Sequence, residues 1–291
     1  TKQKDNKMKM IETIAARKII NGPFIVRNLV NKGLNKAISK MLRMKSCIVL
    51  YKGISLLDNV TPIMVVMSGY TKDSANSKTG PLIQLYILPI NDKPSDTYKS
   101  GSRSVCGTCK YNGNNGCYVR WSHLTSMWNS ARTQNPIDKE LSKELMKGLR
   151  IRVGAAGDPL AVPSDFWRDV LSSCDSFTGY THQWSDKNLS SAYKDMFMAS
   201  VDSPSEQMRA RARGWNTFQV LDGEEPIDKS TLCLATIPNK TDLNGLPMSC
   251  ASCMLCNGKG TKAIHVQLHG ASNTVAKARK ARQQHTTQAS V

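Results

Sequence analysis

The chain has 291 residues, of which 40% are hydrophobic, and it carries a formal net charge of +18. A chain of this length can bury a sizeable core, so it does not need a metal ion or a disulfide merely to fold. No window approaches the roughly 20 apolar residues that span a membrane, and the first residues lack the apolar segment of a signal peptide. We therefore expect an intracellular, cytoplasmic protein with no membrane partner.

The positive charge is concentrated at the two ends of the chain. Residues 1–52 contain 13 Lys and Arg against 2 acidic residues, and residues 257–291 contain 6 against none. The middle of the chain is left with a net charge of only +1. Basic ends favour contact with the phosphate backbone of a nucleic acid, which releases counterions, although solvated disordered tails would have the same composition.

In chain order, the first elements expected are one or two basic helices within residues 11–44, interrupted near residues 21–23 (Asn-Gly-Pro). Beyond them, apolar and β-branched runs bounded by turn residues predict strands. These strands are expected at residues 47–51, 62–67, 82–88, 149–153, 177–184, 197–203, 217–221 and 264–270. Helical spacing and capping residues predict helices at residues 141–148, 165–173, 189–195, 205–214 and 274–284.

Strands that alternate with helices of about ten residues indicate βα units and a parallel sheet. We therefore expect an α/β fold built on a complete or partial parallel βα barrel, with a cysteine-rich metal-binding segment. The expected domains are a basic helical N-terminal lobe over residues 1–46, a barrel-like domain with two cysteine clusters over residues 47–270, and a basic C-terminal tail over residues 271–291. The sequence does not determine the oligomeric state.

Seven of the nine cysteines fall into two groups whose spacings are typical of metal ligands, which a reducing compartment favours over disulfides. The first group is Cys106, Cys109 and Cys117, in a stretch rich in the Gly and Asn residues that form tight turns. Three thiolates are one short of a closed tetrahedral site. Either another residue, such as His123, completes a zinc knuckle, or the three thiolates hold an iron–sulfur cluster with one exposed iron.

The second group is Cys233, Cys250, Cys253 and Cys256, which places four cysteines within 24 residues. Four thiolates are enough to close a tetrahedral zinc site or to hold an iron–sulfur cluster without further ligands. The Cys-x2-Cys-x2-Cys run resembles cluster ligation more than a zinc ribbon. Zinc, or free structural cysteines, are the alternatives.

Charged and imidazole side chains stand at the carboxyl ends of the predicted strands, where parallel sheets bind ligands. Asp158, His182 and Asp202 are therefore candidate catalytic residues, and His269 ends the last strand. His182 and Trp184 are expected to stack on and hydrogen-bond a base or cofactor ring, and the aspartates to hold ribose hydroxyls or a proton. Taken singly, each is better explained as a strand-terminating or capping residue, and it is the four together that favour a site.

Several common activities lack their motifs in this chain. There is no Walker A sequence, no Rossmann glycine fingerprint and no Gly-x-Ser-x-Gly, and the pair His265 and His269 lacks the glutamate of a zinc-protease helix. The sequence therefore does not indicate a P-loop nucleotide hydrolase, a classical dehydrogenase or a serine hydrolase.

The order of the motifs resembles that of an uncharacterised family of phage and bacterial proteins. The motifs that carry the resemblance are residues 69–80, Cys106-Gly107-x-Cys109 with Cys117-Tyr118-Val119, Gly157-Asp158-Pro159, residues 178–184, residues 198–203 and the terminal cysteines. More remotely, the chain resembles radical-SAM-like phage proteins, in which a cysteine element precedes the strand ends of a partial βα barrel. Seven residues separate Cys109 and Cys117, whereas radical-SAM enzymes usually have Cys-x3-Cys-x2-Cys.

The resemblance implies a phage-type, cysteine-ligated metalloprotein, located in the host cytoplasm if a phage encodes it. As a radical-SAM-like enzyme it would act on nucleic acid or a nucleotide, with an iron–sulfur cluster and S-adenosylmethionine at the first cysteine group. The alternative is a non-enzymatic, zinc-stabilised protein that binds nucleic acid through its basic termini in phage replication or regulation.

Overall fold

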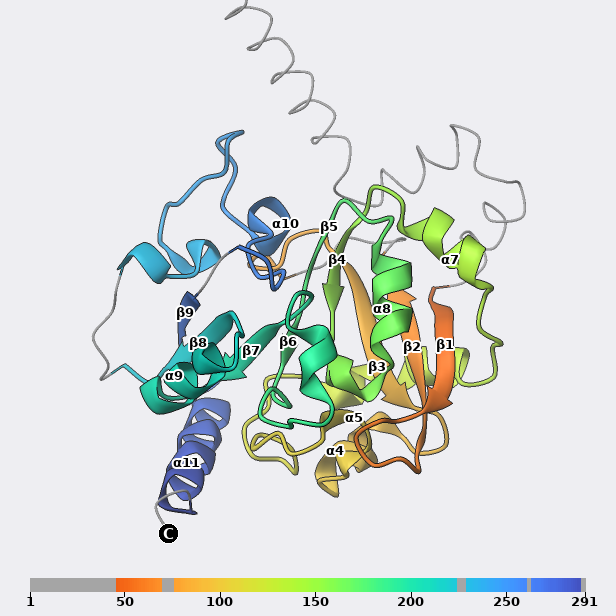
Figure 1. Cartoon of the computed structure of the whole chain (residues 1–291), viewed down its shortest axis with the longest axis horizontal. Helices are drawn as coiled ribbons and strands as arrows, with labels where there is room; N and C mark the ends of the chain where they lie inside the picture. The colour runs from red at the N-terminus through yellow and green to blue at the C-terminus, as the bar shows by residue number, and fades with distance from the viewer. Residues whose placement is uncertain (1–45, 70–75, 224–228, 261–262, 289–291) are drawn as a thin grey trace, which may run out of the picture.

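The computed structural model describes residues 46–69, 76–223, 229–260 and 263–288, which form a mixed α/β fold (Figure 1). Nearly all of the expected N-terminal lobe lies outside these residues, and so does part of the polar loop at residues 70–75. Among the helices of the described residues, none combines the length and the apolar character that crossing a membrane requires.

Strands occur where the apolar runs predict them. They are β1 (Ile48–Ile54), β2 (Pro62–Ser68), β3 (Ile83–Pro89), β4 (Arg150–Val153), β5 (Ser176–Thr178), β6 (Tyr180–Thr181), β7 (Met198–Val201), β8 (Thr217–Leu221) and β9 (Ala263–Gln267). They form one sheet in the order β1-β2-β3-β4-β5 and a second in the order β6-β7-β8-β9. From β3 onward, each strand is parallel to its neighbour within its sheet, which confirms the predicted parallel arrangement for this part of the chain.

The first three strands differ from that expectation, because β1, β2 and β3 pair antiparallel. For β1 and β2 the physical reason is the length of the connection: residues 55–61 suffice for a hairpin turn, whereas a parallel crossover needs a dozen or more residues. The strand pairing among the described residues also does not close a barrel.

Gly179 is the single residue between β5 and β6, so one stretch of chain contributes to both sheets. Its N–H donates to the carbonyl of Cys256 (3.1 Å), and its carbonyl accepts from the N–H of Met198 (3.0 Å). A Cβ atom at this position would lie 2.5 Å from Cδ1 of Phe197, so only glycine fits. The chain passes from the first sheet to the second at Gly179, so the predicted strand 177–184 is split there.

The helices of the described residues are more varied than the sequence predicts, and α11 is longer than the helix expected at residues 274–284. The α-helices are α4 (Pro94–Lys99), α5 (Arg103–Cys106), α6 (Thr125–Ala131), α7 (Lys139–Met146), α8 (Ser164–Leu171), α9 (Pro204–Ala212), α10 (Cys250–Cys253) and α11 (Ser272–Gln288). The 3-10 helices are η1 (Trp121–Leu124), η2 (Pro159–Ala161), η3 (Ser190–Tyr193), η4 (Lys229–Thr231) and η5 (Leu234–Thr236). The helix expected at residues 189–195 is only η3 (Ser190–Tyr193), and α8 begins one residue before the range expected for it, with Pro163 as its N-cap.

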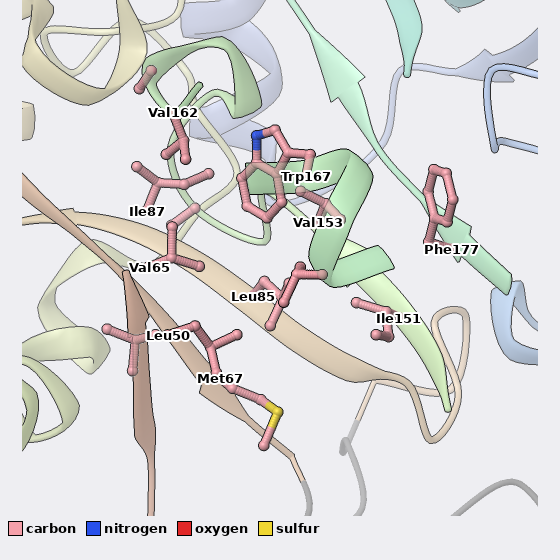
Figure 2. Close-up of a cluster of buried hydrophobic side chains, with 14 of the residues drawn as sticks. Leu50, Val65, Met67, Leu85, Ile87, Ile151, Val153, Val162, Trp167 and Phe177 are labelled. Carbon is pink, nitrogen blue, oxygen red and sulfur yellow. The ribbon is translucent and has the colours of Figure 1, made fainter. Parts of the chain in front are cut away.

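The main hydrophobic core lies between the first sheet and α8. Figure 2 shows side chains of neighbouring strands, among them Val65, Ile87 and Val153, gathered around Trp167 of α8. Trp167 is fully buried, and its indole N–H donates to the carbonyl of Pro159 (2.8 Å). This packing fixes the segment that follows β4, where Asp158 lies. Truncating a buried tryptophan to alanine typically costs about 3–5 kcal/mol, so the core anchors this edge of the sheet firmly.

Candidate metal centres

The first cysteine group lies in the connection between β3 and β4, on a loop made of tight turns. Cys106 ends α5, and its carbonyl accepts from the N–H of Cys109 (3.0 Å), so one turn brings these two residues together. Positive φ angles at Gly107 (54°) and Gly116 (94°) redirect the chain before Cys109 and Cys117. Glycine adopts such angles without strain, which explains the glycine content of the loop.

The three thiols are near enough to influence each other's charge. Burial raises the pKa of Cys106 well above the ordinary value of a thiol, and the neighbouring Cys109 and Cys117 raise it further. Burial also raises the pKa of Cys117 to about 11, with Cys109 contributing. As the side chains stand, however, no three His, Cys, Asp or Glu groups in the described residues converge to the spacing of a metal site.

His182, which follows β6, is the imidazole that meets this group. Its side chain hydrogen-bonds to Cys109, and its ring lies edge-on to Tyr111 with the centroids 5.9 Å apart. Burial lowers the pKa of His182, but Cys109 and two acidic neighbours outweigh that effect and raise it to about 9. His123, the fourth ligand suggested by the sequence, is exposed. His182 is therefore the better-placed partner for the three thiols.

Asp158 joins the segment after β4 to the end of β6 rather than facing an open site. Its Oδ1 accepts from the hydroxyl of Thr181 (2.8 Å) and the N–H of Leu160 (3.0 Å), and its Oδ2 accepts from the N–H of His182 (2.8 Å). Burial raises the pKa of Asp158, and these hydrogen bonds counteract part of the effect. The backbone N–H of Asp158 also donates to the carbonyl of Val105 (2.6 Å), which ties this segment to the cysteine loop.

Gln183 holds the cysteine loop through its side-chain amide, a role the sequence analysis missed. Its Oε1 accepts from the N–H (3.1 Å) and the hydroxyl (2.9 Å) of Thr108, and its Nε2 donates to the carbonyl of Cys106 (3.1 Å). A Cβ atom at Gly107 would lie 2.4 Å from Gln183 Oε1. The only sequence signal was the position of Gln183 inside the motif at residues 178–184.

Trp184 occupies a different place from the one expected. It is only 6% exposed, and its indole N–H donates to the carbonyl of Ser200 (3.1 Å). Its side chain is part of the hydrophobic core, so no open ring face is available for a base or cofactor.

Asp202 meets the cysteine loop from the end of β7. Its Oδ1 accepts from the hydroxyl of Tyr111 (2.6 Å), and its Oδ2 lies 3.1 Å from the ammonium of Lys110. Lys110 also pairs with Glu206 (3.2 Å), whose Oε2 accepts from the N–H of Asp202 (2.8 Å). Asp202 is only 5% exposed. The structure thus brings Asp158, His182 and Asp202 to the same edge as the first cysteine group. Both aspartate carboxylates accept hydrogen bonds from other residues of the protein.

The expected basic tail is a helix that packs against this edge. Arg282 of α11 donates to the carbonyl of Asp202 and to that of Val220, the latter at 3.0 Å. Lys277 donates to Asn114 Oδ1 (3.1 Å), and a Cβ atom at Gly116 would lie 2.4 Å from the backbone N of Ala278. His269, at the end of β9, is exposed, and its Nδ1 lies 2.6 Å from the carbonyl of Gln267.

A hollow of about 320 Å³ opens beside Cys109. The residues that line it are Gly101, Gly107, Thr108, Cys109, Lys110, Asn112, Gly113 and Asn115. Asn112 is buried, and its Nδ2 donates to the carbonyl of Ser102 (2.8 Å), whereas its Oδ1 has no hydrogen-bond partner among the described residues. That oxygen is itself buried, and a donor that reached it from the hollow would satisfy it.

The second cysteine group lies at the opposite end of the strands. Figure 1 shows α10, which carries Cys250 and Cys253, near the amino ends of the central strands, and α5 near their carboxyl ends. The N–H of Cys250 donates to the carbonyl of Lys78 (2.8 Å), and Arg150 of β4 donates to the carbonyl of Ala251 (2.6 Å). The two groups are therefore separate.

Comparison of the chain with models of protein families, with curated proteins and with solved structures gives no match. Arguments about function therefore rest on the residues and their geometry.

Proposed function

We propose that this chain is a phage-type metalloenzyme acting on a nucleic acid or a nucleotide, with its catalytic metal held by Cys106, Cys109 and Cys117. The observation that carries the proposal is the position of these thiols at the carboxyl edge of the parallel strands, beside His182 and Asp202. Parallel α/β sheets bind their ligands at this edge. The assignment to phages rests on the sequence resemblance alone.

The succession of strands supports a radical-SAM-like version of this proposal. Parallel neighbours follow one another in chain order within each sheet, as β3-β4-β5 in the first and β6-β7-β8-β9 in the second, which is the strand order of βα units. The first cysteine group lies in the first connection of this parallel series. An iron–sulfur cluster held there would supply one-electron chemistry and one open iron for S-adenosylmethionine.

The protein's own residues would hold the loop and receive a ligand. Gln183 and the pair formed by Tyr111 and Asp202 fix the loop from two sides. The hollow beside Cys109 offers space on the solvent side, and Asn112 Oδ1 offers it a hydrogen-bond acceptor. The preferred ligand therefore carries an N–H or O–H donor, as amino groups and ribose hydroxyls do.

One observation favours a second function, that of a zinc-stabilised nucleic-acid-binding protein without catalytic activity. The hydrogen bond between His182 and Cys109 places an imidazole where it could complete a closed Cys3His zinc site. In this version the basic ends contact the phosphate backbone. Within α11, Arg282 is buried and Arg279 pairs with Asp222 (2.7 Å), so residues 1–52 would make most of the contacts.

Anaerobic purification of the full chain, followed by visible absorbance and metal analysis, tests the two functions. Iron with charge-transfer absorbance that persists in His182→Ala supports the enzyme, because three thiolates suffice for the cluster. Stoichiometric zinc without iron at both cysteine groups would overturn it. Zinc lost from the first group in His182→Ala, but retained in the control His123→Ala, would establish the second function.

A titration with nucleic acid across salt concentrations tests the partner independently. Contact through basic residues must weaken steeply with salt, with a logarithmic slope of about −0.9 for each neutralised phosphate of duplex DNA. An affinity that does not change with salt would contradict contact through the basic ends.

A further inference from the structure

The segment between β8 and β9 has very little apolar core of its own. Over residues 229–260 the regular structure consists of η4, η5, α10 and the isolated bridge between Thr241 and Pro247. Its larger apolar side chains include Leu243 and Leu246, which are 84% and 58% exposed. A segment that buries so little needs another source of stability, for which small domains commonly use a metal or a disulfide.

The second cysteine group connects the two ends of this segment. Cys233 precedes η5, and its N–H donates to the carbonyl of His265 in β9 (2.7 Å). Burial raises the pKa of Cys250 to about 11, with Cys233 as the next cause, and burial raises that of Cys256 to about 12. Cys233 contributes to the raised pKa of Cys253 as well. Cys233 also packs against the small buried cluster of Met198, Cys256 and Ile264, and α10, which carries Cys250 and Cys253, contacts η5 beside Cys233. The four cysteines therefore lie in one region, although 16 residues separate Cys233 from Cys250. As the side chains stand, the described residues of this region do not converge to the spacing of a metal site either.

Two side chains, one from each sheet, lie near these cysteines. The hydroxyl of Tyr180, in β6, donates to the sulfur of Cys256. Arg152, in β4, has Cys250 and Tyr180 among its charged or polar neighbours, and its Nη2 donates to the hydroxyl of Tyr118 (2.5 Å). Among the described residues, no carboxylate pairs with Arg152.

A partly buried guanidinium without a carboxylate is costly unless other negative charge compensates for it. The Tyr118 hydroxyl and the face of its ring, whose centroid lies 5.8 Å from the guanidinium carbon, supply only partial compensation. Four thiolates around a divalent metal leave two uncompensated negative charges, which a neighbouring cation stabilises. A hydroxyl that donates a hydrogen bond to a ligating sulfur is likewise common around thiolate-bound metals.

We propose that Cys233, Cys250, Cys253 and Cys256 form a closed tetrathiolate metal centre that fastens residues 229–260 to the sheet, with Arg152 as its counter-ion and Tyr180 as its hydrogen-bond donor. The metal is a zinc ion or the iron of a cluster, both of which accept four thiolates. The role of this centre is structural, because all its coordination positions come from the protein. It is independent of the function proposed for the first group.

Metal analysis of the full chain by native mass spectrometry tests the centre. We expect Cys250→Ser with Cys253→Ser to remove one metal centre and leave the content of the first group unchanged. If the first group binds metal, Cys106→Ser with Cys109→Ser should remove that metal and leave the content of the second group unchanged. If the first group binds none, this double variant should lose no metal. The two proposals therefore fail separately. Cys174→Ser, outside both groups, is the control. A metal content unaffected by the Cys250 and Cys253 changes would overturn the centre.

Thiol alkylation of the unaltered chain covers the case in which the double variant does not fold. We expect peptide mapping to find Cys233, Cys250, Cys253 and Cys256 protected until a chelator is added. Equal alkylation with and without the chelator would overturn the centre.

The counter-ion role has its own readout, the rate at which a chelator removes metal from the second group. Loss of an outer contact typically costs about 10-fold to 100-fold in metal affinity, so Arg152→Gln should release metal faster by a factor in that range. Arg152→Lys, which keeps the charge, should stay closer to the unaltered protein, and Arg168→Gln serves as a distant control. Equal rates for Arg152→Gln and the unaltered protein would remove Arg152 from the proposal.

Discussion

At the scale of single residues, four consecutive side chains, beginning with the last residue of β6, organise the carboxyl edge. Thr181 binds the Asp158 carboxylate, His182 meets Cys109, Gln183 holds the cysteine loop and Trp184 anchors in the core. The sequence placed this motif correctly at a strand end, because strand periodicity is local. It did not predict the partners, since Gln183 reaches a residue 75 positions away and only the fold brings them together.

Replacing Gln183 by Leu should destabilise the folded protein by about 1–3 kcal/mol, because the N–H of Thr108 and the carbonyl of Cys106 would lose partly buried hydrogen bonds. Urea denaturation of both proteins measures the difference in free energy of unfolding. Thr108→Ser, which keeps the hydroxyl donor, should lose much less free energy of unfolding. An unchanged midpoint for Gln183→Leu would show that the amide does not hold the loop.

At the scale of elements, the sequence identified the strands better than their directions. Each predicted strand has a counterpart among β1 to β9, because β-branched apolar runs favour strands wherever they pair. Orientation depends on the length of the connection, and for β1 and β2 the short turn imposed a hairpin. The short helix α5 and the docking of α11 depend on tertiary contacts, which no local pattern encodes.

Asp58 stabilises that hairpin through its carboxylate. It accepts from the N–H groups of Val60 (3.1 Å) and Thr61 (3.0 Å) and from the hydroxyl of Thr61 (2.6 Å). Partial burial would raise the pKa of Asp58, but these hydrogen bonds lower it below the ordinary value of 3.8. The folded state therefore gains stability above that value, and the gain is lost as the pH falls through the lowered pKa.

Asp58→Asn should accordingly be less stable than the unaltered protein at neutral pH, by about 1 kcal/mol. The difference should shrink as the pH falls below the ordinary value of 3.8. Thermal unfolding of both proteins as a function of pH measures it. A difference that stays constant down to the lowest pH would refute the assigned role of the carboxylate.

The contact between the cysteine loop and α11 is tested by a pair of glycine substitutions. Gly116 and Gly148 both have positive φ angles (94° and 70°), but an added Cβ meets the α11 backbone at Gly116 and nothing within 4 Å at Gly148. Both alanine variants incur the backbone strain of about 1–3 kcal/mol, and only Gly116→Ala must also displace α11. We expect a lower melting temperature for Gly116→Ala than for Gly148→Ala. Equal losses would mean that α11 does not pack on the loop.

At the scale of the whole molecule, the fold places the two cysteine groups at opposite ends of the strands, whereas the sequence predicted the groups but not their positions relative to one another. The first lies at the carboxyl edge with His182 and Asp202, and the second lies at the other end with Arg152 and Tyr180. Spacing along the chain predicted which cysteines belong together. It could not find His182 as the partner of the first group or Arg152 as the neighbour of the second, because both come from strands distant in sequence.

The metal content of the first cysteine group tests the central claim most directly. Full-length protein purified anaerobically should bind one more metal centre than a variant with Cys106, Cys109 and Cys117 all replaced by alanine, measured by native mass spectrometry on both samples. The variant should retain the metal of the second group, which shows that it has folded. Equal metal content in the two proteins would contradict the claim that these thiols hold a metal at the carboxyl edge.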